Sequence, residues 1–137
     1  MFCVGEASSQ DAGQLILHRG HHNFVIMNLY PYTSGHVMVA PYAHISEMSQ
    51  TESPQLSEMM SLARDSVAGL DEIYRPEGYN IGMNVGQSAG AGIKDHLHLH
   101  VVPRWTGDTN FMTVTGETRV LPEDLQVTYE KLKPYFE

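Results

Sequence analysis

Residues 96–102 read His-Leu-His-Leu-His-Val-Val, and this alternation of polar and apolar side chains decides how the surrounding chain folds. Successive side chains of a β-strand point to opposite faces of the sheet. A strand over residues 97–102 therefore aligns the imidazoles of His96, His98 and His100 on one face. The aliphatic side chains between them point to the other face, where they can pack on a hydrophobic core.

Further elements are predicted on both sides of this strand. Short apolar runs bounded by turn residues predict strands at 15–18, 24–28, 36–40 and 79–84, with a short extra strand at 111–114. Ser53 is suited to cap a helix that has Pro54 in its first position, and residues 75–78 end that helix. Pro122 begins a terminal helix with one apolar face.

The order of these elements predicts an α+β fold. We expect a mostly antiparallel five-stranded sheet, one main helix and a C-terminal helix, all in a single domain over residues 1–137. At this length a chain buries about two-thirds of the surface that its unfolded form exposes.

Composition narrows the class of protein. The formal net charge of -8 argues against nonspecific binding to nucleic acid, because proteins that grip many phosphates carry a basic field. No apolar run approaches the roughly 20 residues that cross a bilayer, so we expect no membrane association. A single cysteine, Cys3, cannot form an intramolecular disulfide, which favours a reducing, cytoplasmic location.

The three alternating histidines have competing interpretations. Their spacing disfavours surface residues without a role, and burial of all three would require hydrogen-bond partners for every ring nitrogen. Three imidazoles could hold a catalytic zinc ion. One imidazole could instead attack phosphorus while its neighbours orient it. Strand spacing alone does not separate the zinc site from the nucleophile.

A glycine-rich loop precedes the histidines. Residues 84–92 read Asn-Val-Gly-Gln-Ser-Ala-Gly-Ala-Gly, and such small residues let backbone amides approach an anion closely. The loop does not match the Walker pattern. Beside three histidines it predicts a phosphate-binding segment, with these candidate contacts: Asn84, Ser88, Gly90, Ala91 and Gly92.

The sequence resembles the histidine triad (HIT) family. Residues 95–105, Asp-His-Leu-His-Leu-His-Val-Val-Pro-Arg-Trp, resemble the family signature, and residues 35–39 with Asn28 resemble its upstream strand pair. Residues 105–112 and 118–122 resemble a bacterial branch that includes diadenosine tetraphosphate phosphorylases and related hydrolases. The resemblance extends over about residues 2–136. It implies the HIT-like fold and a homodimer, or higher homo-oligomer, with a continuous sheet across the interface.

The resemblance also implies a role for each site residue. His98 matches the nucleophile that attacks the α-phosphorus of a dinucleoside polyphosphate or related nucleotide and forms a covalent nucleotidyl-histidine intermediate. His96 and His100 match the flanking members that bind phosphate and help the leaving group depart. His36 matches a supporting fourth histidine, and Asn28 a residue near the ribose. Water, or phosphate in a phosphorylase, would then release the nucleotide.

Two departures from the family pattern concern the loop and a metal. Many relatives carry Gln or Ser where this chain has Gly92 and Ile93, so the phosphate contacts pass to backbone amides or to Ser88. Relatives with Cys-x-x-Cys can bind structural zinc, of which Cys3, His44 and His96 would be remnants.

We expect no required cofactor and a small-molecule nucleotide as partner. A zinc-dependent hydrolase that uses the triad as ligands, or a nucleotide-binding module with little turnover, are the alternatives. Arg104, close to the triad, is a candidate contact for the polyphosphate tail.

Overall fold

The computed structural model describes residues 11–90, 96–108 and 123–136. Across these residues, five strands form a sheet in the spatial order β1-β2-β3-β5-β4, with every neighbouring pair antiparallel. The strands are β1 (Ile16–Arg19), β2 (Asn23–Met27), β3 (Val37–Pro41), β4 (Gly78–Gly82) and β5 (Leu99–Arg104). The α-helices are α1 (Asp11–Gln14), α2 (Ser53–Tyr74) and α4 (Leu125–Leu132). Short 3-10 turns are η1 (Met48–Gln50), η2 (Gln87–Ala89) and η3 (Lys133–Phe136).

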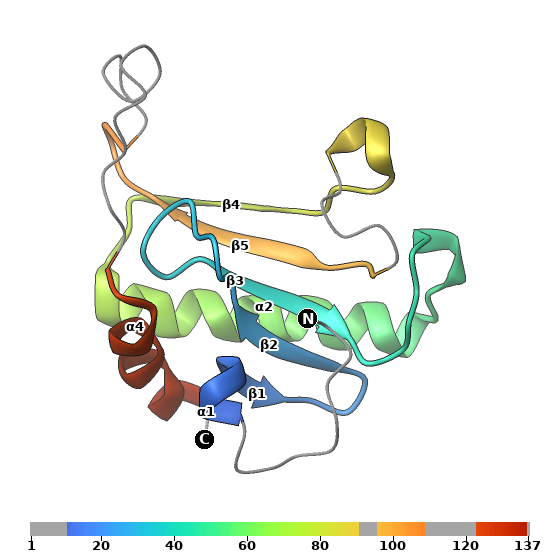
Figure 1. Ribbon diagram of the computed structural model, residues 1–137, viewed down its shortest axis with the longest axis horizontal. Coiled ribbons are helices and arrows are strands. Elements are labelled where there is room, and N and C mark those ends of the chain that lie inside the picture. The colour runs from blue at the N-terminus through green and yellow to red at the C-terminus, as the bar shows by residue number, and fades with distance from the viewer. Residues whose placement is uncertain (1–10, 91–95, 109–122, 137) are drawn as a thin grey trace.

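This architecture confirms the predicted α+β fold with its five-stranded antiparallel sheet. Figure 1 shows α2 lying across one face of the sheet, with α4 beside it near β1. Four strands start and end within a residue or two of their predicted limits, as is usual for element boundaries. The extra strand predicted at 111–114 lies outside the described residues. None of the helices in the described ranges combines the length and hydropathy that a membrane span requires.

The histidine strand also lies within two residues of its predicted limits, 97–102, but both of its ends are shifted toward the C-terminus. β5 runs from Leu99 to Arg104. Its pairing with β3 stops where Leu99 lies opposite Val39. The N–H of Leu97 instead donates to the carbonyl of Ile45 at 2.7 Å. The segment before Leu99 therefore lies outside the sheet.

The histidines consequently lie partly in and partly before β5. His100 lies in the strand, whereas His96 and His98 belong to the connecting segment that leads into it. His100 lies opposite Met38 of β3. Paired residues share a face of an antiparallel sheet. The histidine therefore lies on the face of Met38, and its neighbour Val101 points to the face that packs on α2.

Both faces of the sheet carry buried apolar side chains. The larger cluster fills the space between the sheet and helices α2 and α4. The smaller cluster lies on the histidine face and comprises Ile16, Phe24, Ile26, Met38 and Ala40. Burial of this kind stabilises the fold by about 25 cal/mol per Å² of apolar surface, so the sheet is a firm platform for the site.

The helix starts differ from prediction by a few residues. The N-cap of α2 is Glu52 rather than Ser53, because the side chain of Gln55 accepts a hydrogen bond from the Glu52 N–H at 2.8 Å. α4 does not begin at Pro122. Its N-cap is Asp124, whose carboxylate accepts hydrogen bonds from two backbone N–H groups of the first turn.

The turn before β3 brings His36 to the sheet. Gly35 has φ +85°, a left-handed conformation that side chains with a Cβ adopt only at a cost. A Cβ built there would lie 2.7 Å from Leu70 Cδ2 of α2. The hydroxyl of Thr33 donates to the carbonyl of Pro103 at 2.8 Å, which ties the turn to the end of β5. This close packing fixes the backbone from which His36 projects.

Candidate active site

The position of the proton on His98 follows from its hydrogen-bond partner. His98 Nδ1 lies 3.0 Å from the carbonyl oxygen of His96. A carbonyl can only accept, so Nδ1 must carry the proton and donate it. In the neutral ring Nε2 is then unprotonated and holds the lone pair that a nucleophile needs.

A second chain of contacts sets the tautomers of His36 and His100. The backbone N–H of Tyr32 donates to His36 Nδ1 at 3.2 Å, so the neutral His36 ring carries its proton on Nε2. That Nε2 lies 2.9 Å from His100 Nδ1 and donates to it. His100 is therefore left with its proton on Nε2, where it can serve as a donor.

Burial keeps these supporting rings neutral. Burial, with smaller contributions from the neighbouring His100 and His98, lowers the pKa of His36 to about 3. Burial, with a smaller contribution from His98, also lowers the pKa of His100 to about 4. The ring centroids of His98 and His100 are 4.8 Å apart in an edge-to-face arrangement. The ring with the unprotonated Nε2 and the ring with the Nε2–H donor are thus in contact.

His96 points to a different part of the fold. Its Nε2 donates to the carbonyl of Pro41, at the end of β3, at 2.7 Å. Burial lowers the pKa of the His96 ring, against the opposing effect of this hydrogen bond. Because its carbonyl also accepts the proton of His98, the arrangement favours a positioning role for His96 over direct phosphate contact.

The predicted nucleotide contacts lie on two sides of the histidines. Asn28 follows β2, and its Nδ2 lies 3.4 Å from His36 Nε2. On the opposite side, Asn84 and His100 line a pocket of about 510 Å³ beside β4 and β5. Ser88 lies in η2 and Gly90 follows it with φ +87°; both are exposed. The other two predicted loop residues lie outside the described residues: Ala91 and Gly92.

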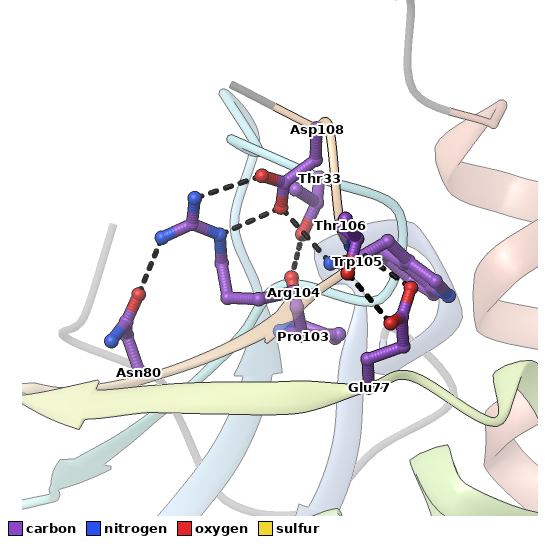
Figure 2. A network of polar contacts seen from close by, with 8 residues as sticks. All are labelled: Thr33, Glu77, Asn80, Pro103, Arg104, Trp105, Thr106 and Asp108. Atoms are coloured by element: carbon purple, nitrogen blue, oxygen red, sulfur yellow. Dashed lines mark hydrogen bonds and ion pairs between the residues drawn. The ribbon is translucent and has the colours of Figure 1, made fainter. Parts of the chain in front are cut away.

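Sequence reasoning missed three contributors to the site. Tyr32 was predicted only as part of a turn, yet its N–H fixes the His36 tautomer and its ring centroid lies 4.9 Å from that of His36. Asn80 and Asp108 hold the guanidinium of Arg104 at the end of the pocket, as Figure 2 shows. Of these contacts, only the pairing of Arg104 with Asp108, four positions later, could have been predicted from the local sequence.

Comparison with known proteins assigns this arrangement to a family. A model of the HIT domain matches residues 10–107, well over half of the chain. The chain belongs to the HIT family. As a HIT protein it is 41% identical over 118 residues to the AP-4-A phosphorylase of Mycobacterium tuberculosis, which covers 86% of this chain and 60% of the relative. It thus spans less than two-thirds of that relative's length.

Other relatives support the same assignment. A Zn-bound histidine triad family protein from Mycobacterium smegmatis has 26% identity and a TM-score of 0.74 over 93% of this chain and 87% of its own. The bis(5'-adenosyl)-triphosphatase of Dictyostelium discoideum is 24% identical over 84% of this chain and 80% of the relative. The expected HIT-like fold is confirmed.

The Mycobacterium smegmatis protein is Zn-bound, which makes the potential metal ligands of this HIT protein relevant. The rings of His44 and His96 contact each other with centroids 5.4 Å apart, but Cys3 lies outside the described residues. Within the described ranges, no three His, Cys, Asp or Glu side chains group closely enough to hold a metal ion. Among the described residues, His96, His98 and His100 are therefore not grouped as the three ligands of one metal ion.

Nitrogen NMR of the histidine rings tests the assigned tautomers in this HIT protein. At pH 7 we expect a proton on Nδ1 of His98 and on Nε2 of His36 and His100. Titration midpoints should lie at about 3 for His36 and about 4 for His100. The unfolded chain takes up these protons near pH 6.5, so stability should fall as pH drops from there through both folded pKa values. Midpoints near 6.5 for both rings would contradict the assignment.

Proposed function

We propose that this HIT protein cleaves dinucleoside polyphosphates or related nucleotides at the α-phosphorus through a covalent intermediate on His98. One observation carries the proposal: the Nδ1–H of His98 is held on the carbonyl of His96 at 3.0 Å, so the neutral ring keeps its lone pair on Nε2. Imidazole in this state is a nucleophile that needs no strong base to activate it.

In the first step, His98 Nε2 forms a bond to the α-phosphorus while the bond from that phosphorus to the bridging oxygen breaks. The displaced polyphosphate leaves with the electron pair of that bond. The Nε2–H of His100 donates to the phosphoryl oxygens or the departing oxygen, where negative charge grows. Asn28 contacts the ribose, and the loop holds phosphate oxygens.

In the second step, an oxygen of phosphate or water attacks the same phosphorus and the phosphorus–nitrogen bond breaks. The electron pair returns to His98 Nε2, and the attacking group loses its proton to the surrounding acceptors. Phosphate as acceptor yields a nucleoside diphosphate, whereas water yields a monophosphate. Splitting one displacement into two lets the acceptor choose the product.

Adenine dinucleotides are the substrates to test first, since the two named relatives bear names of enzymes that act on them. The experiment incubates the protein with several adenine dinucleotides, with and without phosphate and a strong chelator, and identifies the products. Formation of ADP only when phosphate is present would support a phosphorylase. Turnover that survives chelation would support a mechanism without a metal cofactor, while binding without any product would contradict the proposal.

We also infer that two copies pair through the edge strand β4. The opposite edge of the sheet is covered, because Lys133 Nζ donates to the carbonyl of Leu17 at 2.9 Å and His18 Nδ1 donates to that of Phe136 at 3.0 Å. β4 ends the strand order on the other side and carries Ile81 with 45% of its surface exposed. Exposed apolar edges of this kind favour strand pairing.

Light scattering tests the pairing. We expect a dimer for the unaltered protein and a monomer for Ile81→Lys, because a charge on each facing edge disfavours pairing. Val127→Lys is the control, since Val127 is similarly exposed at 41% but belongs to α4, which Figure 1 shows away from β4. A dimer that persists in Ile81→Lys would contradict pairing through β4.

The cytoplasmic location argued from the lone cysteine stays a prediction.

A further inference from the structure

The pocket beside His100 extends well beyond the reacting histidines. His100, Val102 and Arg104 alternate along β5, so all three point to the same face of the sheet. At about 3.3 Å per residue, Arg104 lies about 13 Å along the strand from His100. All three line the pocket of about 510 Å³, a size typical of small-molecule sites. The pocket therefore runs from the reaction centre to the Arg104 end of β5.

The far end of the pocket is rigidly built. Arg104 donates through Nε and Nη2 to the two carboxylate oxygens of Asp108, at 2.7 and 2.8 Å. Its Nη1 donates to the side-chain oxygen of Asn80 at 2.6 Å. The carboxylate of Glu77 accepts from the N–H and hydroxyl of Thr106 at 2.9 and 2.7 Å, which holds the same turn from the other side. Figure 2 shows the guanidinium clasped between Asn80 and Asp108.

These contacts determine the charge and the accessible surface that the Arg104 end of the pocket offers to a ligand. Among the described residues that line this end, Asp108 balances the charge of Arg104, so they carry no excess positive charge to attract a polyphosphate chain. The Arg104 side chain keeps 39% exposure against 14% for Asp108, which leaves the planar guanidinium accessible for stacking. The remaining lining includes the apolar side chain of Val102, which pairs with Asn80 and shares its face of the sheet.

Asn80 supplies a directed donor. Arginine only donates, so Asn80 must turn its amide oxygen to Arg104 and its NH₂ group the other way. Within the described part of the chain, no residue accepts a hydrogen bond from that NH₂ group. A flat ring with acceptor nitrogens, as in a nucleobase, matches an amide donor beside a stacking surface. Tyr32, 65% exposed, adds an aromatic ring to the same pocket.

The geometry points to this pocket as the site of the second nucleoside of a dinucleoside polyphosphate, the one that leaves with the displaced phosphates. This inference rests on the proposed function, since it assigns the two halves of its substrate to two sides of the histidines. Asn28 lies on the β2 side and the pocket on the β4 side. Asn80 and Arg104 thus favour substrates that carry a second nucleoside at the end of the phosphate chain.

Equilibrium binding in a His98→Ala background tests the inference, because no turnover consumes the ligand there. Diadenosine tetraphosphate is compared with adenosine tetraphosphate, which has the same phosphate chain but lacks the second nucleoside. We expect the dinucleotide to bind about tenfold more tightly, as one or two additional hydrogen bonds would give. Asn80→Ala and Arg104→Met should each bring the two affinities within about twofold of each other.

Two controls make the outcome decisive. Arg64→Met removes an arginine that pairs with Asp65 at 3.2 Å on the exposed side of α2, and it should leave the ratio unchanged. Asn80→Ala leaves the contacts between Arg104 and Asp108 in place, so its effect is separate from any loosening of the turn. Equal weakening of both ligands, or of neither, would overturn the inference. Failure of the proposed function would appear separately, as selective binding by a protein that turns over no dinucleotide.

Discussion

Replacement of His98 by alanine should lower kcat/KM for an adenine dinucleotide by at least about a thousandfold, because it removes the only group assigned to form a bond to phosphorus. This corresponds to about 4 kcal/mol in the activation free energy. His98 is held by the His96 carbonyl at 3.0 Å and is 7% exposed, and alanine places no nucleophile at this position. Steady-state kinetics with product identification measures the loss.

A histidine outside the site provides the matched control. His21 lies in the turn between β1 and β2 and is exposed, so His21→Ala should keep the full rate. Circular dichroism should show that His98→Ala retains the folded spectrum. Turnover by folded His98→Ala at the rate of the unaltered protein would remove His98 from the mechanism.

Replacement of Gly35 by alanine should lower the free energy of unfolding by about 2–4 kcal/mol, which combines backbone strain with overpacking. The strain comes from φ +85°, and the overpacking from a Cβ 2.7 Å from Leu70 Cδ2 and 3.3 Å from Pro103 Cγ. Because His36 follows directly, the substitution should also displace its ring from His100 and reduce the rate. Denaturant unfolding and kinetics on the same samples measure both effects.

Two other glycines separate the causes of this loss. Gly86 shares φ +85°, but no described residue lies within 4 Å of a Cβ built there, so Gly86→Ala should show the effect of backbone strain alone. Gly78 has neither feature, and Gly78→Ala should leave the free energy of unfolding almost unchanged. Equal losses at all three positions would show that the close approach to Leu70 is unimportant.

The sheet and the histidine cluster were predictable because they depend on local patterns. Alternation placed His100 on a strand and Val101 on its buried face, and the turn residues before β3 placed Gly35 in a special conformation. The two-residue shift of the strand start was not predictable, because it depends on a nonlocal partner. Leu97 bonds to Ile45 in a distant loop, and no spacing of residues within 96–102 reveals that contact.

The protonation pattern of the site was unpredictable for the same reason. It depends on the N–H of Tyr32, which meets His36 through a turn, and on the carbonyl of Pro41, which meets His96 from a separate strand. The pocket likewise depends on Asn80 meeting Arg104 across two strands. The carbonyl that holds His98 Nδ1 belongs to His96, two residues earlier in the chain, whereas tertiary contacts determine which nitrogen of His36, His96 and His100 donates.

The stereochemical course at the α-phosphorus tests the central claim most directly. Each in-line displacement inverts the configuration at phosphorus. A substrate made chiral there with sulfur is turned over with phosphate or isotopically labelled water as acceptor, and phosphorus NMR reads the product. An intermediate on His98 Nε2 requires two displacements, so the account predicts overall retention. Inversion would mean that the acceptor attacks the substrate directly, and it would contradict a covalent histidine intermediate.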